Sequence, residues 1–267
     1  MLGKLLKYEF KSTSRTFFIL YPVIIILAIL SKISILAFPD SNIMTIPRIL
    51  ITMLYVLSII FSIFATFFIV IYRFYKNLVS NEGYLMWTLP VKASTHIIAK
   101  LITAFVWQIL SIFVSIGSIL IVIPEYDWIP KLPDAYAKLS QEFTTYTGAS
   151  LTGIIWLTIA LLVVAIIFSY MNFFTALSFG NLASKNKILL SVGAFVAQNV
   201  IFQTVTMTII SISLKTKYIS NEFLDQSFPP ANIIYSRLGL FILIYAVYAV
   251  AEFFISKYIL KNKLNLQ

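Results

Sequence analysis

Six long apolar stretches alternate with short polar segments along the 267-residue chain. Their approximate bounds are 17–38, 50–72, 100–123, 151–174, 188–213 and 237–259. Each is about as long as the ~20 mostly apolar residues that a helix needs to cross the hydrocarbon core of a bilayer. None alternates polar and apolar positions as the strands of a membrane barrel do. The pattern predicts an all-α integral membrane protein with six transmembrane helices in a single transmembrane domain, residues 1–267.

Composition supports this class of protein. Hydrophobic residues make up 60% of the chain and charged residues 11%, with a mean hydropathy of +0.93, whereas a soluble domain is about 45–50% apolar and about 25% charged. The chain has no cysteine, which excludes disulfides and thiolate metal sites. Its one histidine, His96, argues against a zinc site of the usual kind.

The charge distribution predicts the orientation in the membrane. Lysine and arginine gather before the first span, between the second and third, between the fourth and fifth, and after the sixth, where Glu9 and Glu82 are the only acids. The alternate segments are richer in acids than in bases. Because positive segments are retained in the cytoplasm, both termini are expected there. The net charge of +10 is thus a membrane signature, and no nucleic-acid partner is expected.

Residues 1–16 have the pattern of an amphipathic helix that lies in the headgroup plane. Its apolar side holds Leu2, Leu5, Leu6 and Phe10, and its basic side holds Lys4, Lys7, Lys11 and Arg15. Glu9 falls on the otherwise apolar side. We expect Glu9 to pair with a basic residue of a neighbouring span or of a partner protein.

The segment NEGYLMWTLPVKASTHIIAKL, residues 81–101, is unusually apolar for a connector. Gly83 is expected to end the preceding helix in a left-handed conformation, and Ser94 or Thr95 to cap the next helix. One interpretation is an interfacial loop anchored by Trp87. The other is a docking knuckle for a second protein, because an exposed apolar patch with a polar rim marks an interaction site. The docking residues would be Glu82, Gly83, Tyr84, Leu85, Met86, Trp87, Leu89 and Pro90.

The fifth span is the most polar. Asn199, Gln203 and Thr206 recur at helical spacing, and they either form hydrogen bonds between helices, worth about 0.6 kcal/mol each, or line a translocation pathway. In the sixth span, Glu252 is the acid of interest. It forms a structural ion pair, lies near the inner interface, or serves as a proton site.

The ordered motifs around the docking knuckle resemble permease subunits of type II ABC exporters. They are FYKNL at 74–78, EGYL at 82–85, TLPV at 88–91 and KL at 100–101. The opening KYEFK at 7–11, the loop GNLASKNK at 180–187 and the closing YILKNKLNL at 258–266 also agree. Each motif is short, but their order and the six spans cover nearly the whole chain.

The resemblance implies a transport subunit of a bacterial cytoplasmic (plasma) membrane. The cytoplasmic element after the second span would be a coupling helix that docks on an ABC ATPase subunit. Two permease copies, in a homodimer or a heterodimer, would form the pathway. The chain itself would bind no cofactor and would be no enzyme, since ATP and Mg would act through the ATPase. No phosphate-binding loop motif occurs among its eight glycines. The many aromatic residues favour hydrophobic or amphipathic cargo, and we expect peptides, such as phenol-soluble modulins or antimicrobial peptides.

Three other classes of protein compete with this interpretation. An ion-coupled secondary transporter needs carboxylates near the midplane, and Glu252 is the one candidate. An intramembrane enzyme of the immunity-protein kind needs clustered glutamate and histidine within the spans, which a single histidine does not supply. A membrane sensor or scaffold without transport also fits the pattern of spans.

Overall fold

The computed structural model describes residues 2–37, 45–80, 83, 86, 88, 90–123, 126, 129–183, 185–217 and 230–262. These residues form helices, turns and loops, and no strand occurs among them. Six of the helices are long and apolar enough to cross a membrane. For the part of the chain that the structure describes, the predicted all-α fold with six helices able to span a membrane is therefore confirmed.

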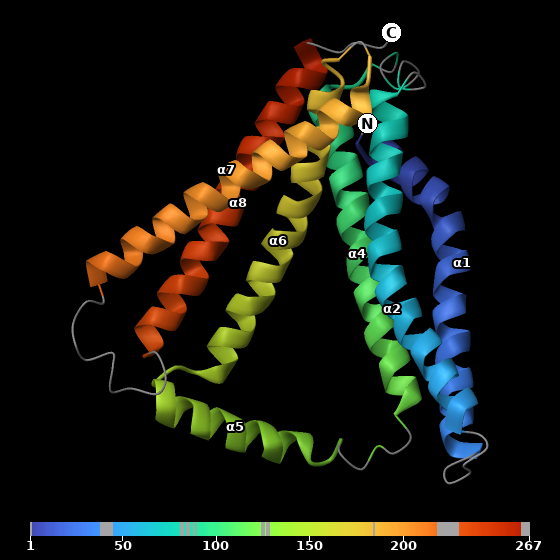
Figure 1. The fold of residues 1–267 in the computed structure, drawn as a ribbon, viewed down its shortest axis with the longest axis vertical. Helices are drawn as coiled ribbons and strands as arrows, with labels where there is room; N and C mark the ends of the chain where they lie inside the picture. Colours follow the sequence, from blue (N-terminus) through green and yellow to red (C-terminus); the bar gives the residue numbers. More distant parts are fainter. Residues whose placement is uncertain are drawn as a thin grey trace. The chain divides into compact units, whose positions relative to one another are not determined.

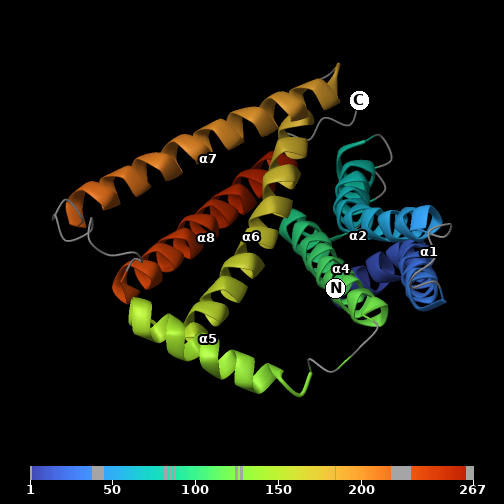
Figure 2. The same cartoon turned by 60° about the horizontal axis from the view of Figure 1, so that its bottom comes forward.

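The chain divides into two compact units, Met1–Ile129 and Pro130–Gln267. Unit 1 consists of the helices α1 (Leu2–Ala37), α2 (Thr45–Phe74), the short π-helical turn η1 (Tyr75–Val79) and α4 (Ala93–Val122). All three long helices contact one another, with α1 packed on both α2 and α4 (Figures 1 and 2).

Unit 2 consists of α5 (Leu132–Thr147), α6 (Leu151–Gly180), α7 (Lys187–Lys217) and α8 (Ala231–Asn262). Its central element is α6, which packs against α8, α7 and α5. The short helix α5 lies in the polar segment between the third and fourth apolar stretches. It ends at Gly148, whose φ of 69° is the left-handed conformation typical of a helix C-terminus.

The first helix is longer than a membrane span. Its 36 residues extend for about 54 Å at ~1.5 Å per residue, against a hydrocarbon core of ~30 Å. The proposed interfacial helix over residues 1–16 is the beginning of this continuous helix, with no break before the first span. Within it, Leu5, Leu6 and Phe10 are half-buried, whereas Lys4 and Lys7 are exposed. Whether it lies on a membrane surface stays a prediction.

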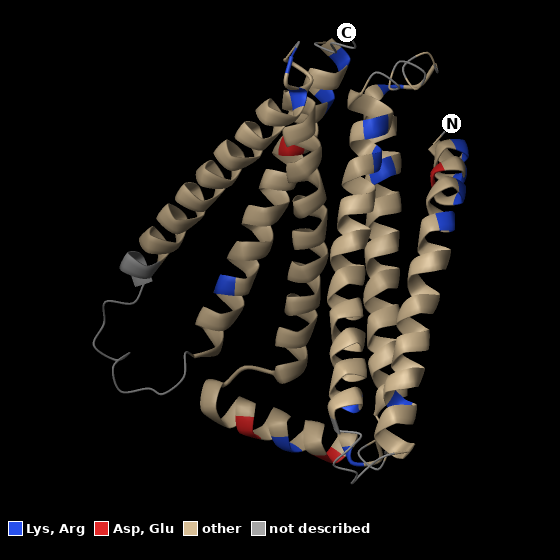
Figure 3. Cartoon of the chain, turned by 45° about the vertical axis from the view of Figure 1, so that its right-hand side comes forward, with Lys and Arg blue, Asp and Glu red and all other residues tan. Residues whose placement is uncertain are grey.

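Most basic residues of unit 1 lie at one end of its helices, whereas Lys32 and Arg48 lie toward the other end. Figure 3 shows Lys and Arg at the N-terminal end of α1, the C-terminal end of α2 and the N-terminal end of α4. These three ends are the ones predicted to face the cytoplasm. Charge placement along the helices is thus consistent with the orientation rule.

The turn after α2 differs in detail from the expectation. Ser80 N donates to Tyr75 O at 2.9 Å and Gly83 N donates to Ser80 O at 2.8 Å, so backbone bonds close the turn. Gly83 does not have a positive φ. It is needed for space, because a Cβ there would lie 3.1 Å from the carbonyl of Leu78. The N-cap of α4 is Lys92, without a side-chain hydrogen bond, so the prediction that Ser94 or Thr95 caps this helix was wrong.

Candidate functional site

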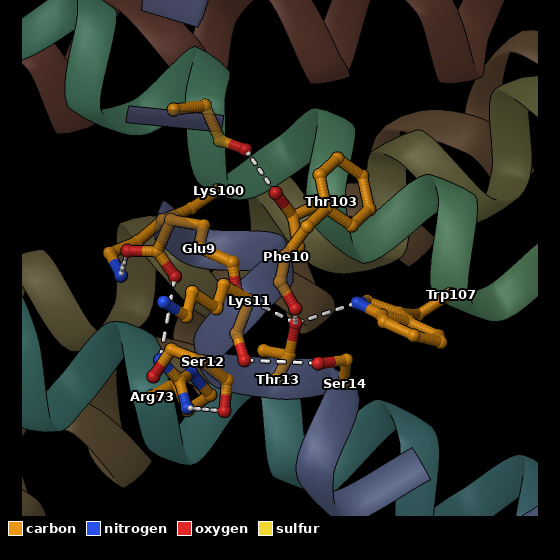
Figure 4. A network of polar contacts seen from close by, with 11 residues as sticks. Glu9, Phe10, Lys11, Ser12, Thr13, Ser14, Arg73, Lys100, Thr103 and Trp107 are labelled. Atoms are coloured by element: carbon orange, nitrogen blue, oxygen red, sulfur yellow. Dashed lines mark hydrogen bonds and ion pairs between the residues drawn. The ribbon is translucent and has the colours of Figure 1, made fainter. Parts of the chain in front are cut away.

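A buried cluster of charged residues joins the three long helices of unit 1 (Figure 4). Glu9 of α1 is 8% exposed, and its Oε1 accepts a hydrogen bond from Lys100 Nζ of α4 at 2.8 Å. Arg73, at the end of α2, places its Nη2 3.7 Å from Glu9 Oε2. One carboxylate thus holds a cation from each of the other two helices. Of the two expectations for Glu9, the pairing with a neighbouring span is confirmed.

Arg73 forms its direct hydrogen bonds to Ser12 rather than to Glu9. Its Nη2 donates to Ser12 Oγ at 2.6 Å and its Nη1 donates to Ser12 O at 3.2 Å. The guanidinium therefore binds α1 through hydrogen bonds to Ser12 and through its charge interaction with Glu9. Because charge-assisted hydrogen bonds are stronger than neutral ones, this contact fixes the C-terminal end of α2 on α1.

A second set of contacts, between α1 and α4, supports the position of Glu9. Thr13 Oγ1 donates to Glu9 O at 2.8 Å, and Trp107 Nε1 of α4 donates to Thr13 Oγ1 at 2.8 Å. The Trp107 ring stacks on Phe17 of α1, with centroids 4.1 Å apart. Since Phe17 is fully buried, this layer holds Glu9 in register with Lys100 on the facing helix. We call Glu9, Ser12, Thr13, Arg73, Lys100 and Trp107 the Glu9 cluster.

A stripe of small polar residues continues the α4 contacts into the apolar part of unit 1. Ser111 Oγ lies 2.6 Å from Thr66 Oγ1 of α2 and 3.0 Å from the Tyr21 hydroxyl of α1. Further along, Ser118 Oγ lies 3.0 Å from the Tyr55 hydroxyl. Small residues allow close approach of membrane helices, and hydroxyls bond across them. The stripe Ser111, Ser115, Ser118 is spaced at i, i+4 and i+7, a pattern that sequence reasoning had passed over.

The Glu9 cluster lies near the ends of the two helices that flank the predicted docking segment, residues 82–90. Arg73 precedes Ser80 by seven positions and Lys100 follows the start of α4, Ala93, by seven. At ~1.5 Å per residue, each cation is about 10 Å along its helix from the end that leads into the segment. The helices on both sides of the segment, α2 and α4, therefore contact the same carboxylate on α1, that of Glu9.

The docking segment itself is described only in part. Gly83 is buried, Met86 is half-buried, and Thr88 and Pro90 are exposed. Glu82, Tyr84, Leu85, Trp87 and Leu89 lie outside the described residues. The residues on either side are firmly packed, since Leu78, Val79 and Ile97 are fully buried. The proposed coupling helix stays a prediction.

Unit 2 contains a second buried polar cluster, formed by α6, α7 and α8. Glu252 of α8 is 5% exposed. Its Oε1 accepts a hydrogen bond from Asn172 Nδ2 at 2.9 Å, and Asn172 Oδ1 accepts one from Asn199 Nδ2 at 3.2 Å. Thr175 Oγ1 donates to the Glu252 backbone carbonyl at 3.0 Å. We call Asn172, Thr175, Asn199 and Glu252 the Glu252 cluster.

The three residues proposed for the translocation pathway do not share one environment. Asn199 is half-buried and bonded to Asn172, Thr206 is buried, and Gln203 is exposed. Asn199 thus forms the hydrogen bond between helices that was one of the two expectations for this stripe. Sequence reasoning missed Asn172, although it sits within a strongly apolar helix where an amide is a clear signal. The pathway role stays a prediction.

Fold and clusters together define the class of this chain: a multi-pass α-helical membrane protein with a charged cluster at one end of unit 1 and an amide–carboxyl cluster within unit 2. The described residues hold no group of three or more His, Cys, Asp or Glu side chains that could bind a metal ion. Comparison of the chain with family models, with curated proteins and with solved structures gives no match.

Proposed function

We propose that this chain is the membrane-spanning subunit of an ATP-driven exporter in a bacterial cytoplasmic membrane. In this proposal, a separate ABC ATPase docks on residues 82–90 and supplies the energy. Two copies, or this chain and a related subunit, form the pathway for a hydrophobic or amphipathic cargo, most simply a peptide. Both termini and the docking segment lie on the cytoplasmic side.

The observation that carries the proposal is that the helices before and after the docking segment, residues 82–90, are held by the same residue of α1. A docking element transmits the motion of an ATPase only if both of its ends are fixed to the spans. Here Arg73 leads into the segment and Lys100 follows it, and both contact Glu9. A force applied to the segment would therefore reach α1, α2 and α4 together, which is what an energised subunit without its own nucleotide site requires.

The π-helical turn at Tyr75–Val79 is a second supporting feature. Such turns are rare overall, and those that occur are often found at functional sites. This one lies between Arg73 and the docking segment. It ends at Ser80, whose backbone is extended, and the backbone bonds of Ser80 and Gly83 close the turn immediately before the segment.

The cargo proposal is supported by the apolar character of the spans. An apolar groove of about 680 Å³ runs between α1 and α2. Its lining is Thr16, Ile19, Leu20, Val23, Ile24, Ser58, Phe61, Phe64, Ala65, Phe68 and Ile69. Surfaces of this kind suit hydrophobic side chains better than sugars or ions.

The test is a purification of the tagged full-length chain from its own membrane in mild detergent. We expect an ABC-type ATPase in about stoichiometric amount with the native chain. Leu85→Asp should lower the bound ATPase at least about tenfold, since burying an unpaired charge in an interface costs well over the ~1.4 kcal/mol of one decade. ATP-dependent export should fall in parallel.

The matched control is Leu139→Asp on α5, where the same change falls on a side chain that is 59% exposed and predicted to lie on the opposite side of the membrane. It should retain both ATPase binding and export. The proposal is overturned if no ATPase accompanies the native chain in any mild detergent, or if Leu85→Asp binds the ATPase and exports as the native chain does.

A further inference from the structure

Among the described residues of unit 2, Glu252 is the one buried acid, and its two carboxyl oxygens differ in their contacts. Glu252 Oε1 accepts from Asn172 Nδ2 at 2.9 Å. Glu252 Oε2 is buried and has no hydrogen-bond partner among the described residues. Because an ionised carboxylate seeks several donors or a cation, a single amide donor does not satisfy it.

No described cation of the unit forms an ion pair with this carboxyl. Helix α6 has no charged residue, and the lysines of α7 are near its ends, at 187, 215 and 217. On α8, Arg237 donates to Ser213 Oγ at 3.0 Å, and Lys257 Nζ lies over the Phe254 ring, 5.7 Å from its centroid. The nearest titratable neighbour on the same helix is Tyr248, one turn earlier.

Aromatic rings close one side of the cluster. Phe168, Phe202 and Tyr248 each lie three or four positions from a polar member of the cluster on α6, α7 and α8, respectively. The ring centroids of Phe168 and Phe202 are 4.7 Å apart, and those of Phe202 and Tyr248 are 4.9 Å apart. On the other side, Ser178 and Ser256 join α6 to α8 at 2.9 Å. The carboxyl is thus enclosed between an aromatic layer and a hydroxyl pair.

We propose that Glu252 is a proton-binding site, occupied while α6, α7 and α8 are packed together. A proton neutralises the carboxyl without needing a cavity, and Oε1 still accepts the Asn172 bond. An unpaired neutral hydroxyl at Oε2 costs far less than an unpaired buried charge. Release of the proton then requires these helices to separate, so that water reaches the carboxylate. This inference does not depend on ATPase docking.

The proposal fixes the sign of the pH dependence. The packed state binds one more proton than a state in which Glu252 meets water, so the stability of the packed unit falls as pH rises. Asn172, Thr175 and Asn199 surround the carboxyl and do not titrate. The remaining titratable neighbour, Tyr248 of α8, is a phenol, and phenols ionise only near pH ~10 in water. The effect near neutral pH therefore belongs to Glu252.

Infrared spectroscopy of the purified full-length chain in lipid tests the proposal directly. Near neutral pH, the native chain should show the C=O stretch of a protonated carboxylic acid, and Glu252→Gln should lose it. The matched control is Glu142→Gln, the same change on an exposed residue of α5, which should keep the band. The proposal fails if the native chain has no such band near neutral pH, or if the band survives in Glu252→Gln.

A thermal melting series supports or overturns the same proposal through an independent readout. The melting temperature of the native chain and of Glu142→Gln should fall as pH rises, and that of Glu252→Gln should stay level. Should Glu252→Gln fail to fold, the carboxylic-acid C=O band of the native chain must still disappear reversibly as pH rises.

A comparison of salts separates a proton from a metal cation. If Na⁺ or K⁺, compared with choline at equal ionic strength, stabilises the native chain but not Glu252→Gln, the ligand is a metal cation and the proton assignment is overturned.

Discussion

Within the described part of the chain, each unit buries one carboxylate, and the two have opposite surroundings. In unit 1, Glu9 lies near the beginning of α1 and meets Lys100 at 2.8 Å and Arg73 at 3.7 Å. In unit 2, Glu252 lies within the apolar part of α8 and meets the amide of Asn172. Both side chains are at least nine-tenths buried. The difference is in what surrounds them.

Position along the helix accounts for this difference. Residues near a helix end in a membrane protein can be matched by long cationic side chains, whose stems lie along apolar surface and whose heads reach polar surroundings. Within the span, a cation beside the carboxylate would itself need to leave water. Unit 1 therefore holds its helices together by charge at one end, whereas unit 2 relies on neutral amides and hydroxyls.

This contrast suggests a division of labour. A charge-paired junction such as the Glu9 cluster has one favourable arrangement, because separating the partners leaves buried charges unpaired. A neutral junction such as the Glu252 cluster changes its state with a single proton. Unit 1 is then suited to receiving a force, and unit 2 to changing its packing.

The strongest test of this contrast removes the cation that Glu9 contacts directly. Lys100→Met keeps the length and apolar stem of the side chain and leaves Glu9 with Arg73 at 3.7 Å. We expect unit 1 to lose about 3–5 kcal/mol of unfolding free energy, the range for breaking a buried pair. Reversible unfolding in mixed micelles gives the value. Lys92→Met, the same change at the exposed N-cap of α4, should cost no more than about 0.5 kcal/mol. Equal losses in the two variants would show that the Glu9 pair contributes nothing specific.

Much of the fold follows from the sequence because the signal is long and repeated. Six apolar runs, each of span length, leave little choice of secondary structure. Glu9 was also visible, since an acid on the apolar face of a helix needs a partner. Arg73 and Lys100 were not identifiable as those partners, because the positive-inside pattern offers many cations at the same membrane level and sequence spacing does not say which helices touch.

The Glu252 cluster was likewise predictable from the sequence only in part. Its acid could be found from the sequence, but its partners are single amides on two other helices, Asn172 and Asn199. Asn199 was noticed as part of a polar stripe, and Gln203, its neighbour in that stripe, is exposed instead. Which side of a helix faces inward depends on the packing angle, and the fifth span carries no apolar face strong enough to reveal it.

A smaller effect is expected from the layer that supports Glu9. Trp107→Phe keeps most of the stack on Phe17 but removes the Nε1 donor to Thr13 Oγ1. Losing one buried hydrogen bond should cost about 1–2 kcal/mol. The control is Trp156→Phe in α6, where the ring is 67% exposed, and its cost should stay within about 0.5 kcal/mol. If the two variants unfold at the same free energy, Trp107 acts only through its apolar surface.

The weakest effect is expected for a feature that the two units share, a hydroxyl pair between helices. Each has a hydroxyl pair between two helices: Thr66 and Ser111 at 2.6 Å in unit 1, and Ser178 and Ser256 at 2.9 Å in unit 2. Double-mutant cycles that replace threonine by valine and serine by alanine should give a coupling of about 0.6 kcal/mol for both pairs, the average for such bonds in a membrane protein. Tyr21 also bonds Ser111, but it is present in all four proteins of the first cycle, so its contribution to the pair coupling largely cancels. Similar coupling energies would show that the two units differ in their buried carboxylates and not in their hydroxyl pairs. A coupling several times larger in unit 1 would instead show that the whole α2–α4 contact, hydroxyls included, is built more rigidly than α6–α8.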